Sequence, residues 1–87
     1  MPRYKIVFKP SAERAFLALP KEVQRRLDAR LLGLQDNPRP SGVKALTGAA
    51  GVYRLRVGAY RILYEVHDDT VLVLVLRIGH RREVYRK

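Results

Sequence analysis

The sequence predicts a small α+β domain in which two N-terminal antiparallel helices pack on one face of a small antiparallel sheet. Two stretches with helical spacing of apolar residues come first, and stretches with strand alternation follow them. At 87 residues the chain is expected to form a single domain, 1–87. It has no cysteine, so neither a disulfide nor a thiolate metal site can support the fold.

The N-terminal half reads as one strand followed by two helices. Residues 4–8 alternate between apolar and polar side chains, which predicts a short strand that Pro10 ends. Ser11 is a candidate N-cap for the first helix. Pro20 breaks this helix and can be the first residue of the second, which ends at Asp36-Asn37-Pro38. The apolar stripes of both helices are expected to be core: Ala12, Ala15, Phe16, Leu19, Val23, Leu27, Leu31 and Leu34.

The C-terminal half reads as a loop followed by three strands. Residues 37–51 are rich in glycine and proline, which predicts a loop with at most a fragment of regular structure. Residues 52–57 and 60–67 alternate around a two-residue turn that begins with Gly58, as a type II′ hairpin requires. Residues 71–77 are almost continuously aliphatic, which is typical of a strand in the interior of a sheet.

The hairpin register predicts a cluster of arginines. A two-residue turn pairs Arg56 with Arg61 directly across the strands, and Arg54 lies two residues along on the same face. Like charges in this relation destabilise a sheet, and Glu65, one carboxylate, cannot neutralise three guanidinium groups. We therefore expect an anion site beside an aliphatic patch that suits a protein contact, formed by Leu63, Leu72, Leu74 and Leu76.

The charge balance favours a polyanionic partner. Eighteen Lys and Arg stand against eight Asp and Glu, for a net charge of +10 and a pI near 10.7. Thirteen of the eighteen cations are arginine, whose planar fork suits phosphate. No apolar run approaches the roughly 20 residues that span a bilayer, and the N-terminus does not read as a signal peptide. We expect a cytoplasmic protein that does not bind a membrane.

Several kinds of chemistry have no signature in the sequence. The phosphate-binding pattern GxxxxGK[ST] does not occur, and two histidines without cysteine give no expectation of a metal or another cofactor. Phosphate chemistry on RNA remains open, because RNA carries its own nucleophile, the 2′-hydroxyl. Arginines can stabilise the charge of its transition state, and either Tyr85 or His80 could assist proton transfer.

Two segments, GVYRLRVGAYRILYEV and VLVLVLRIGHRREVYR, resemble the RelE family within the RelE/ParE toxin superfamily of type II toxin–antitoxin systems. The resemblance covers almost the whole chain. It implies a toxin that enters the ribosomal A site and cuts mRNA, leaving a 2′,3′-cyclic phosphate and a 5′-hydroxyl, so that translation stops. It also implies a RelB-like antitoxin as partner, with operator DNA bound only through the toxin–antitoxin complex.

The resemblance also assigns roles to single residues. Arg61 and Arg81 would stabilise the phosphate, Arg54 and Arg56 would hold the RNA backbone, and Tyr85 would stack on a base. The candidate catalytic residues are thus Arg54, Arg56, Arg61, Arg81 and Tyr85, and further candidates for RNA contact are Lys44, Arg77, His80 and Arg82. The family often has lysine where this chain has Arg54 and Arg56, and arginine cannot act as a general base as lysine can.

Two other readings of the sequence stay open. A ParE-like inhibitor of DNA gyrase would share the fold and cut nothing. A basic RNA-binding module, or an inactive toxin, would keep the charge without the chemistry. The discriminating feature is the arginine and tyrosine constellation, which a protein that does not cut RNA has no need to assemble.

Overall fold

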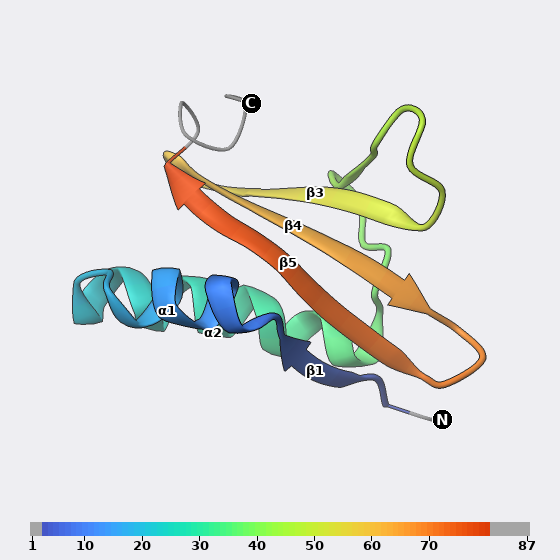
Figure 1. The fold of residues 1–87 in the computed structure, drawn as a ribbon, viewed down its shortest axis with the longest axis horizontal. Helices are drawn as coiled ribbons and strands as arrows, with labels where there is room; N and C mark the ends of the chain where they lie inside the picture. The colour runs from blue at the N-terminus through green and yellow to red at the C-terminus, as the bar shows by residue number, and fades with distance from the viewer. Residues whose placement is uncertain (1–2, 81–87) are drawn as a thin grey trace.

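The computed structural model describes residues 3–80, and this part of the chain forms two helices and five strands (Figure 1). The α+β class predicted from the sequence is confirmed. The elements in chain order are β1 (Lys5–Phe8), α1 (Pro10–Leu17), α2 (Lys21–Asp36), β2 (Lys44–Ala45), β3 (Val52–Val57), β4 (Tyr60–His67) and β5 (Leu72–His80). Neither described helix is long and apolar enough to cross a membrane.

The five strands form one sheet in the order β1-β5-β4-β3-β2. The pairs β2–β3, β3–β4 and β4–β5 are antiparallel, whereas β1 runs parallel to β5. The prediction of a wholly antiparallel sheet is therefore wrong at this edge, and the sheet is mixed. Alternation along a sequence identifies strands but not their directions, which depend here on how the helix pair returns the chain to the sheet.

Both helices pack on one face of the sheet, and α1 and α2 run in opposite directions (Figure 1). α1 lies against β5 and β1, and α2 lies against β1 and β3. The predicted stripes supply the helical side of the core, except for Ala15, which does not belong to the buried cluster or to the residues packed against it. Alternate residues of β3, β4 and β5 supply the other side. The buried cluster consists of Ala12, Leu27, Leu31, Leu34, Leu55, Val57, Ile62, Tyr64, Val66, Val73, Val75 and Ile78.

Both helix starts differ from prediction, by two positions for α1 and by one for α2. α1 begins at Pro10, with Lys9 at the N-cap and no side-chain cap, so the prediction of Ser11 as N-cap is wrong. Proline lacks an N–H and has a helical φ, so Pro10 can open the helix without a cap. Pro20 is the N-cap of α2 instead of its first residue. The Gln24 side-chain amide donates to the carbonyls of Leu17 and Leu19, at 3.2 and 2.8 Å, which closes the end of α1.

The β3–β4 hairpin has the predicted register. Val57 pairs with Tyr60 and Arg56 with Arg61. Gly58 has φ of +59° while Ala59 does not have positive φ, as a type II′ turn requires. The two faces of the hairpin therefore separate as expected: Leu55, Val57 and Ile62 are buried under the helices, and the arginines lie on the opposite face, called here the outer face.

A β-bulge in β5 alters the predicted pattern of the outer face. Tyr64 pairs with Val75 and Leu63 pairs with Arg77, so Leu76 is an extra residue with no partner position on β4. Leu72 and Leu74 lie on the outer face as predicted, because they pair with His67 and Glu65. After the bulge the alternation shifts by one residue, which brings Arg77 to the outer face.

Candidate anion-binding site

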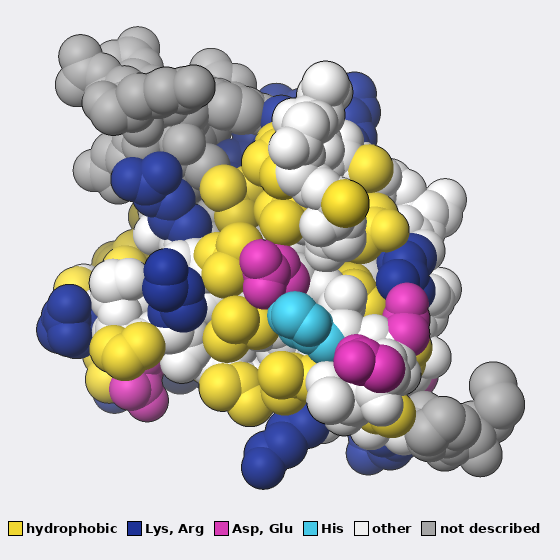
Figure 2. Space-filling view, turned by 45° about the vertical axis from the view of Figure 1, so that its right-hand side comes forward, with side chains coloured by type: hydrophobic (Ala, Val, Ile, Leu, Met, Phe, Trp, Pro, Cys, Tyr) yellow, Lys and Arg dark blue, Asp and Glu magenta, His cyan; other side chains and the backbone are white. Residues whose placement is uncertain are grey.

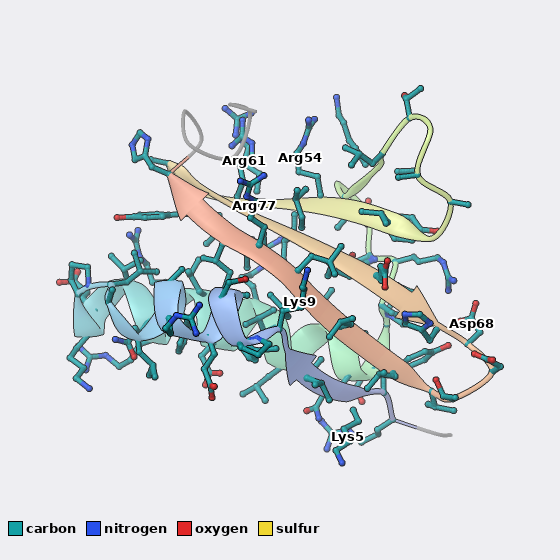
Figure 3. All side chains as sticks on the ribbon, in the orientation of Figure 1. Lys5, Lys9, Arg54, Arg61, Asp68 and Arg77 are labelled. Carbon is teal, nitrogen blue, oxygen red and sulfur yellow. The ribbon has the colours of Figure 1, made fainter. Side chains whose placement is uncertain are left out.

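A small cavity of about 120 Å³ on the outer face is lined by four cations from three adjacent strands. Lys44 of β2 pairs directly with Arg54 of β3, and Arg56 of β3 pairs directly with Arg61 of β4. The remaining lining residue is Gly42. Figure 3 shows Arg54 and Arg61 projecting from the same end of the sheet. The structure thus brings together Lys44, Arg54, Arg56 and Arg61, four of the residues singled out from the sequence.

Strand alternation explains why these side chains converge. Residues two apart on one strand share a face, and directly paired residues on adjacent strands have Cβ atoms about 4.5–5.5 Å apart. Arg61 is only 6% exposed, Arg54 is half-buried and Arg56 is exposed. Among the described residues that line the cavity, four are cations and none is acidic, which favours an anion there.

The cavity suits one phosphate group. Its volume lies well below the roughly 300–1,000 Å³ of pockets for drug-sized molecules, so it fits a single charged group. Guanidinium groups offer paired N–H donors to phosphate oxygens, and such charge-assisted bonds are stronger than neutral ones. The arrangement can therefore bind a phosphodiester and stabilise negative charge that develops on it.

Two further candidates for RNA contact, Arg77 and His80, lie on opposite faces of the sheet. Arg77 is exposed on the outer face opposite Leu63, and Figure 3 shows it near Arg61 on the neighbouring strand. His80 pairs with Tyr60, and its ring contacts the Tyr60 ring at 5.8 Å in an edge-on arrangement. Tyr60 packs against the core, so His80 lies on the helix-covered face, away from the cavity. Arg81, Arg82 and Tyr85 lie outside the described residues.

Glu65, the predicted acidic neighbour of the arginines, has a different partner. Its Oε1 lies 2.9 Å from Nε2 of His67 on the same strand. Within residues 3–80, no three His, Cys, Asp or Glu side chains lie close enough together to hold a metal ion.

A second polar network lies at the opposite end of the sheet, and the sequence reasoning missed it. Arg39 contacts both carboxylate oxygens of Asp68, at 3.2 and 2.6 Å, and its Nε donates to the Tyr53 hydroxyl at 2.9 Å. The Tyr4 hydroxyl donates to Asp68 at 2.6 Å. The hydrogen bonds from Arg39, and then from Tyr4, hold the pKa of Asp68 below its usual value. Arg39 and Asp68 are 29 residues apart, and nothing in their sequence context links them.

An apolar groove follows the bulge, where β1 ends and α1 lies against β5. Its volume is about 540 Å³, and Lys9 and Arg77 are the two cations in its lining. We call it the bulge groove; its other lining residues are Ser11, Ala12, Ala15, Leu63, Leu76 and Ile78. Figure 2 shows hydrophobic side chains gathered on one face of the molecule, with acidic side chains and a histidine among them and Lys and Arg side chains toward the edge.

Comparison with known proteins gives consistent relatives. The family model described as ParE toxin of type II toxin-antitoxin system, parDE, matches residues 6–85. The toxin RelG of Mycobacterium tuberculosis is 31% identical over 85 residues, which cover 97% of this chain and 98% of RelG. The mRNA interferase toxin RelE of Escherichia coli K12 is 33% identical over 86 residues, covering 94% of this chain and 90% of RelE.

Solved structures agree with these matches. The isolated E. coli RelE toxin superposes with a TM-score of 0.81 at 28% identity, covering 88% of this chain and 83% of that one. The archaeal RelE–RelB complex from Pyrococcus horikoshii OT3 gives 0.81 at 27% identity, covering 91% and 96%. Since the matches extend over nearly the full length of both proteins, the chain belongs to the RelE family of toxins of type II toxin–antitoxin systems.

Proposed function

We propose that this toxin is a ribosome-dependent endoribonuclease that cuts mRNA in the A site, with the cationic cavity holding the scissile phosphate. The observation that carries the proposal is the convergence of Lys44, Arg54, Arg56 and Arg61 around a space for one phosphate group. The name of the E. coli relative, mRNA interferase toxin, supports the same reaction. The net charge of +10 favours association with ribosomal and messenger RNA.

The proposed reaction uses the nucleophile that RNA carries. The 2′-oxygen bonds to the adjacent phosphorus while the bond from phosphorus to the 5′-oxygen breaks, which leaves a 2′,3′-cyclic phosphate and a 5′-hydroxyl. The 2′-hydroxyl loses its proton, and the departing 5′-oxygen gains one. Negative charge grows on the phosphoryl oxygens between these events. We propose that Arg61, which is buried, and Arg56, directly opposite, stabilise that charge. We propose that the reaction needs no metal ion.

The proton transfers of this reaction need a side chain that can give up and take up a proton. Arginine keeps its proton throughout the accessible pH range, so Arg54, Arg56 and Arg61 act as charges and hydrogen-bond donors. Among the cavity-lining residues in the described part of the chain, Lys44 is the one whose side chain can exchange a proton with a substrate. Because positioning alone contributes a large part of such rate enhancements, we propose that the ribosome supplies the alignment of the 2′-oxygen. Arg81 and Tyr85 keep the roles that the family resemblance implies.

We propose that a RelB-like antitoxin covers the outer face. Relatives were solved as complexes with RelB from E. coli and P. horikoshii. The bulge groove is mainly apolar with Lys9 and Arg77 beside it, which suits an acidic segment with apolar side chains. Because Arg77 lies near Arg61, a segment bound in the groove reaches the cationic cavity and can exclude RNA from it. Operator DNA is then bound by the complex, mainly through the antitoxin.

The alternative is a ParE-like inhibitor of DNA gyrase, since the matching family model has the ParE name. The cationic cavity favours the nuclease, because a protein that only binds gyrase has no need of four cations around a phosphate-sized space. An inactive RNA-binding relative would keep the charge but not cut.

The test is primer extension on mRNA translated by purified ribosomes. We expect codon-phased cuts with ribosomes and far slower cutting of naked mRNA. Arg56→Ala should slow the cuts, while the control Arg25→Ala, an exposed arginine of α2, should not. Gyrase-linked DNA breaks without RNA cuts would establish the alternative. A scissile phosphorothioate that slows cleavage should not be rescued by Mn²⁺ if no metal takes part.

A further inference from the structure

The loop of residues 37–43 carries the chain from the end of α2 to the cationic cavity. Its last part contributes Gly42, and Lys44 follows as the first residue of β2. At its start, the Tyr64 hydroxyl donates to the carbonyl of Pro38 at 2.7 Å. Near Gly42 the packing is open, since a Cβ placed there would have no atom within 4 Å. Lys44 itself is held by its pairing with Arg54, so the first residues of the loop fix the other end of the segment that carries Gly42.

One guanidinium group joins this loop to two other parts of the fold. Arg39 makes a forked contact to both oxygens of Asp68, in the turn between β4 and β5, at 3.2 and 2.6 Å. Its Nε donates to the Tyr53 hydroxyl at 2.9 Å, and the guanidinium carbon lies 5.5 Å from the centre of the Tyr53 ring. Tyr53 precedes Arg54 on β3 and pairs with Ala45, the neighbour of Lys44. The network thus contacts β3 directly through Tyr53, and it reaches β2 through the pairing of Tyr53 with Ala45.

The Asp68 turn is a fixed point for this contact. The Tyr4 hydroxyl donates to Asp68 at 2.6 Å, and the Lys5 N–H donates to the Val71 carbonyl at 2.9 Å. Val71 has φ of +52°, which a β-branched residue adopts only where its surroundings hold it there. Contacts from the segment at β1 and from the 37–43 loop therefore meet at one constrained turn.

The exposure of the ion pair argues against a purely stabilising role. The side chains of Arg39 and Asp68 are 40% and 58% exposed, and pairs so accessible to water contribute little to overall stability. Their forked geometry nevertheless fixes the direction of both groups. We propose that Arg39 and Asp68 are positioning residues that set the place of Gly42 and Lys44 against the arginines of the cavity, from the other end of the sheet (Figure 3).

This inference rests on the proposed nuclease function. Cleavage kinetics test it together with that function, and amide hydrogen exchange tests the position of the loop independently. The test variants are Arg39→Lys, which keeps the charge and removes the fork, and Asp68→Asn. The matched control is Asp69→Asn in the same turn, whose carboxylate accepts from the adjacent Thr70 N–H at 3.0 Å. Hydrogen exchange is followed at residues 40–45, and kcat and KM are measured on ribosome-bound mRNA.

We expect amide exchange at residues 42–44 to rise about tenfold in both test variants while the strand interiors of β4 and β5 keep their protection. The value of kcat should fall by about ten- to a hundredfold, the range for a displacement approaching ~1 Å, with KM within about twofold. The control should match wild type. Exchange that rises equally across the sheet, or kcat equal to the control's, would overturn the inference.

The two proposals fail in different ways. If the wild-type protein cuts no mRNA but the test variants raise exchange only at residues 42–44, the nuclease proposal is rejected and the positioning role stands. If wild type cuts mRNA and Arg39→Lys cuts at the same rate with unchanged exchange, the positioning role is rejected and the nuclease proposal stands.

Discussion

Replacing Tyr64 with phenylalanine tests how the loop that leads to the cavity is held. Tyr64 is 0% exposed, and its hydroxyl donates to the carbonyl of Pro38, itself a buried residue, at 2.7 Å. Phenylalanine keeps the ring and its stacking on Tyr53, at 5.8 Å between centroids, but removes the donor. A buried carbonyl that loses its donor costs about 1–3 kcal/mol. We expect Tyr64→Phe to lower the free energy of unfolding by that amount at pH 7.

The same substitution has a signature at alkaline pH. Burial raises the pKa of Tyr64 from 10.0 to about 12. Between these values the unfolded chain loses the tyrosine proton while the folded protein keeps it, so the folded state binds more protons and stability falls as pH rises. The contribution is fully present below pH 10, and about 3 kcal/mol, in order of magnitude, is lost once pH exceeds 12. Tyr64→Phe lacks this loss.

Urea unfolding from pH 7 to pH 11.5 measures both effects. The difference in unfolding free energy between wild type and Tyr64→Phe should shrink steadily above pH 10, with the same m value for both proteins. Tyr60→Phe, on the same strand but half-buried, is the control. Parallel curves for wild type and Tyr64→Phe across this range, or a loss below about 0.5 kcal/mol at pH 7, would refute the reasoning.

Further predictions concern the outer face and its turn. Arg61→Ala should slow ribosomal mRNA cleavage by on the order of 10²–10³-fold while antitoxin binding persists; undiminished cleavage by primer extension would remove its assigned role. Deleting Leu76 should leave a folded protein by circular dichroism, because the pairs on both sides of the bulge are kept; an unfolded product would contradict the register. Leu74→Glu should weaken antitoxin binding at least about tenfold by calorimetry, since it places a charge among apolar contacts. Arg39 and Tyr4 lower the pKa of Asp68, so Asp68 contributes stability above the ordinary aspartate pKa of 3.8 and loses it as pH falls further; the stability difference from Asp68→Asn should therefore disappear in acid urea titrations.

The hairpin could be predicted from the sequence because a two-residue turn leaves one register. Gly58 accepts the positive φ that the first turn position requires, and this fixes Arg56 opposite Arg61. Once that pair is set, Arg54 follows from the two-residue period of a strand. Local geometry alone therefore identified three of the four cations around the cavity, and Lys44 joined them through the short strand β2.

The bulge could not be predicted, because the residues around it give no polar marker. Val73, Leu74, Val75 and Leu76 are apolar on both faces of β5, so an extra residue among them leaves the pattern unchanged. The consequence is visible only downstream: strict alternation would have kept Arg77 on the helix side, whereas the bulge brings it to the outer face.

The remaining features depend on contacts between distant segments. The parallel pairing of β1 with β5 and the contact between Arg39 and Asp68 join residues far apart in the chain, and neither has a local signature. The position of His80 on the helix face likewise follows only from its pairing with Tyr60 after the bulge. Single-sequence patterns report neighbours along an element, and these features lie between elements.

The placement of the arginines on strands explains how a small protein tolerates them. Two like charges directly opposite on a sheet are unfavourable by roughly 0.2–1 kcal/mol. The residues that flank Arg56 in sequence, Leu55 and Val57, are buried on the other face, as is Ile62 beside Arg61. Each such side chain contributes about 1.5–3 kcal/mol on burial, so the core face of the same strands more than offsets the repulsion. A helix layer on one face thus supplies the stability, so that the outer face can carry the cations that the proposed phosphate site needs.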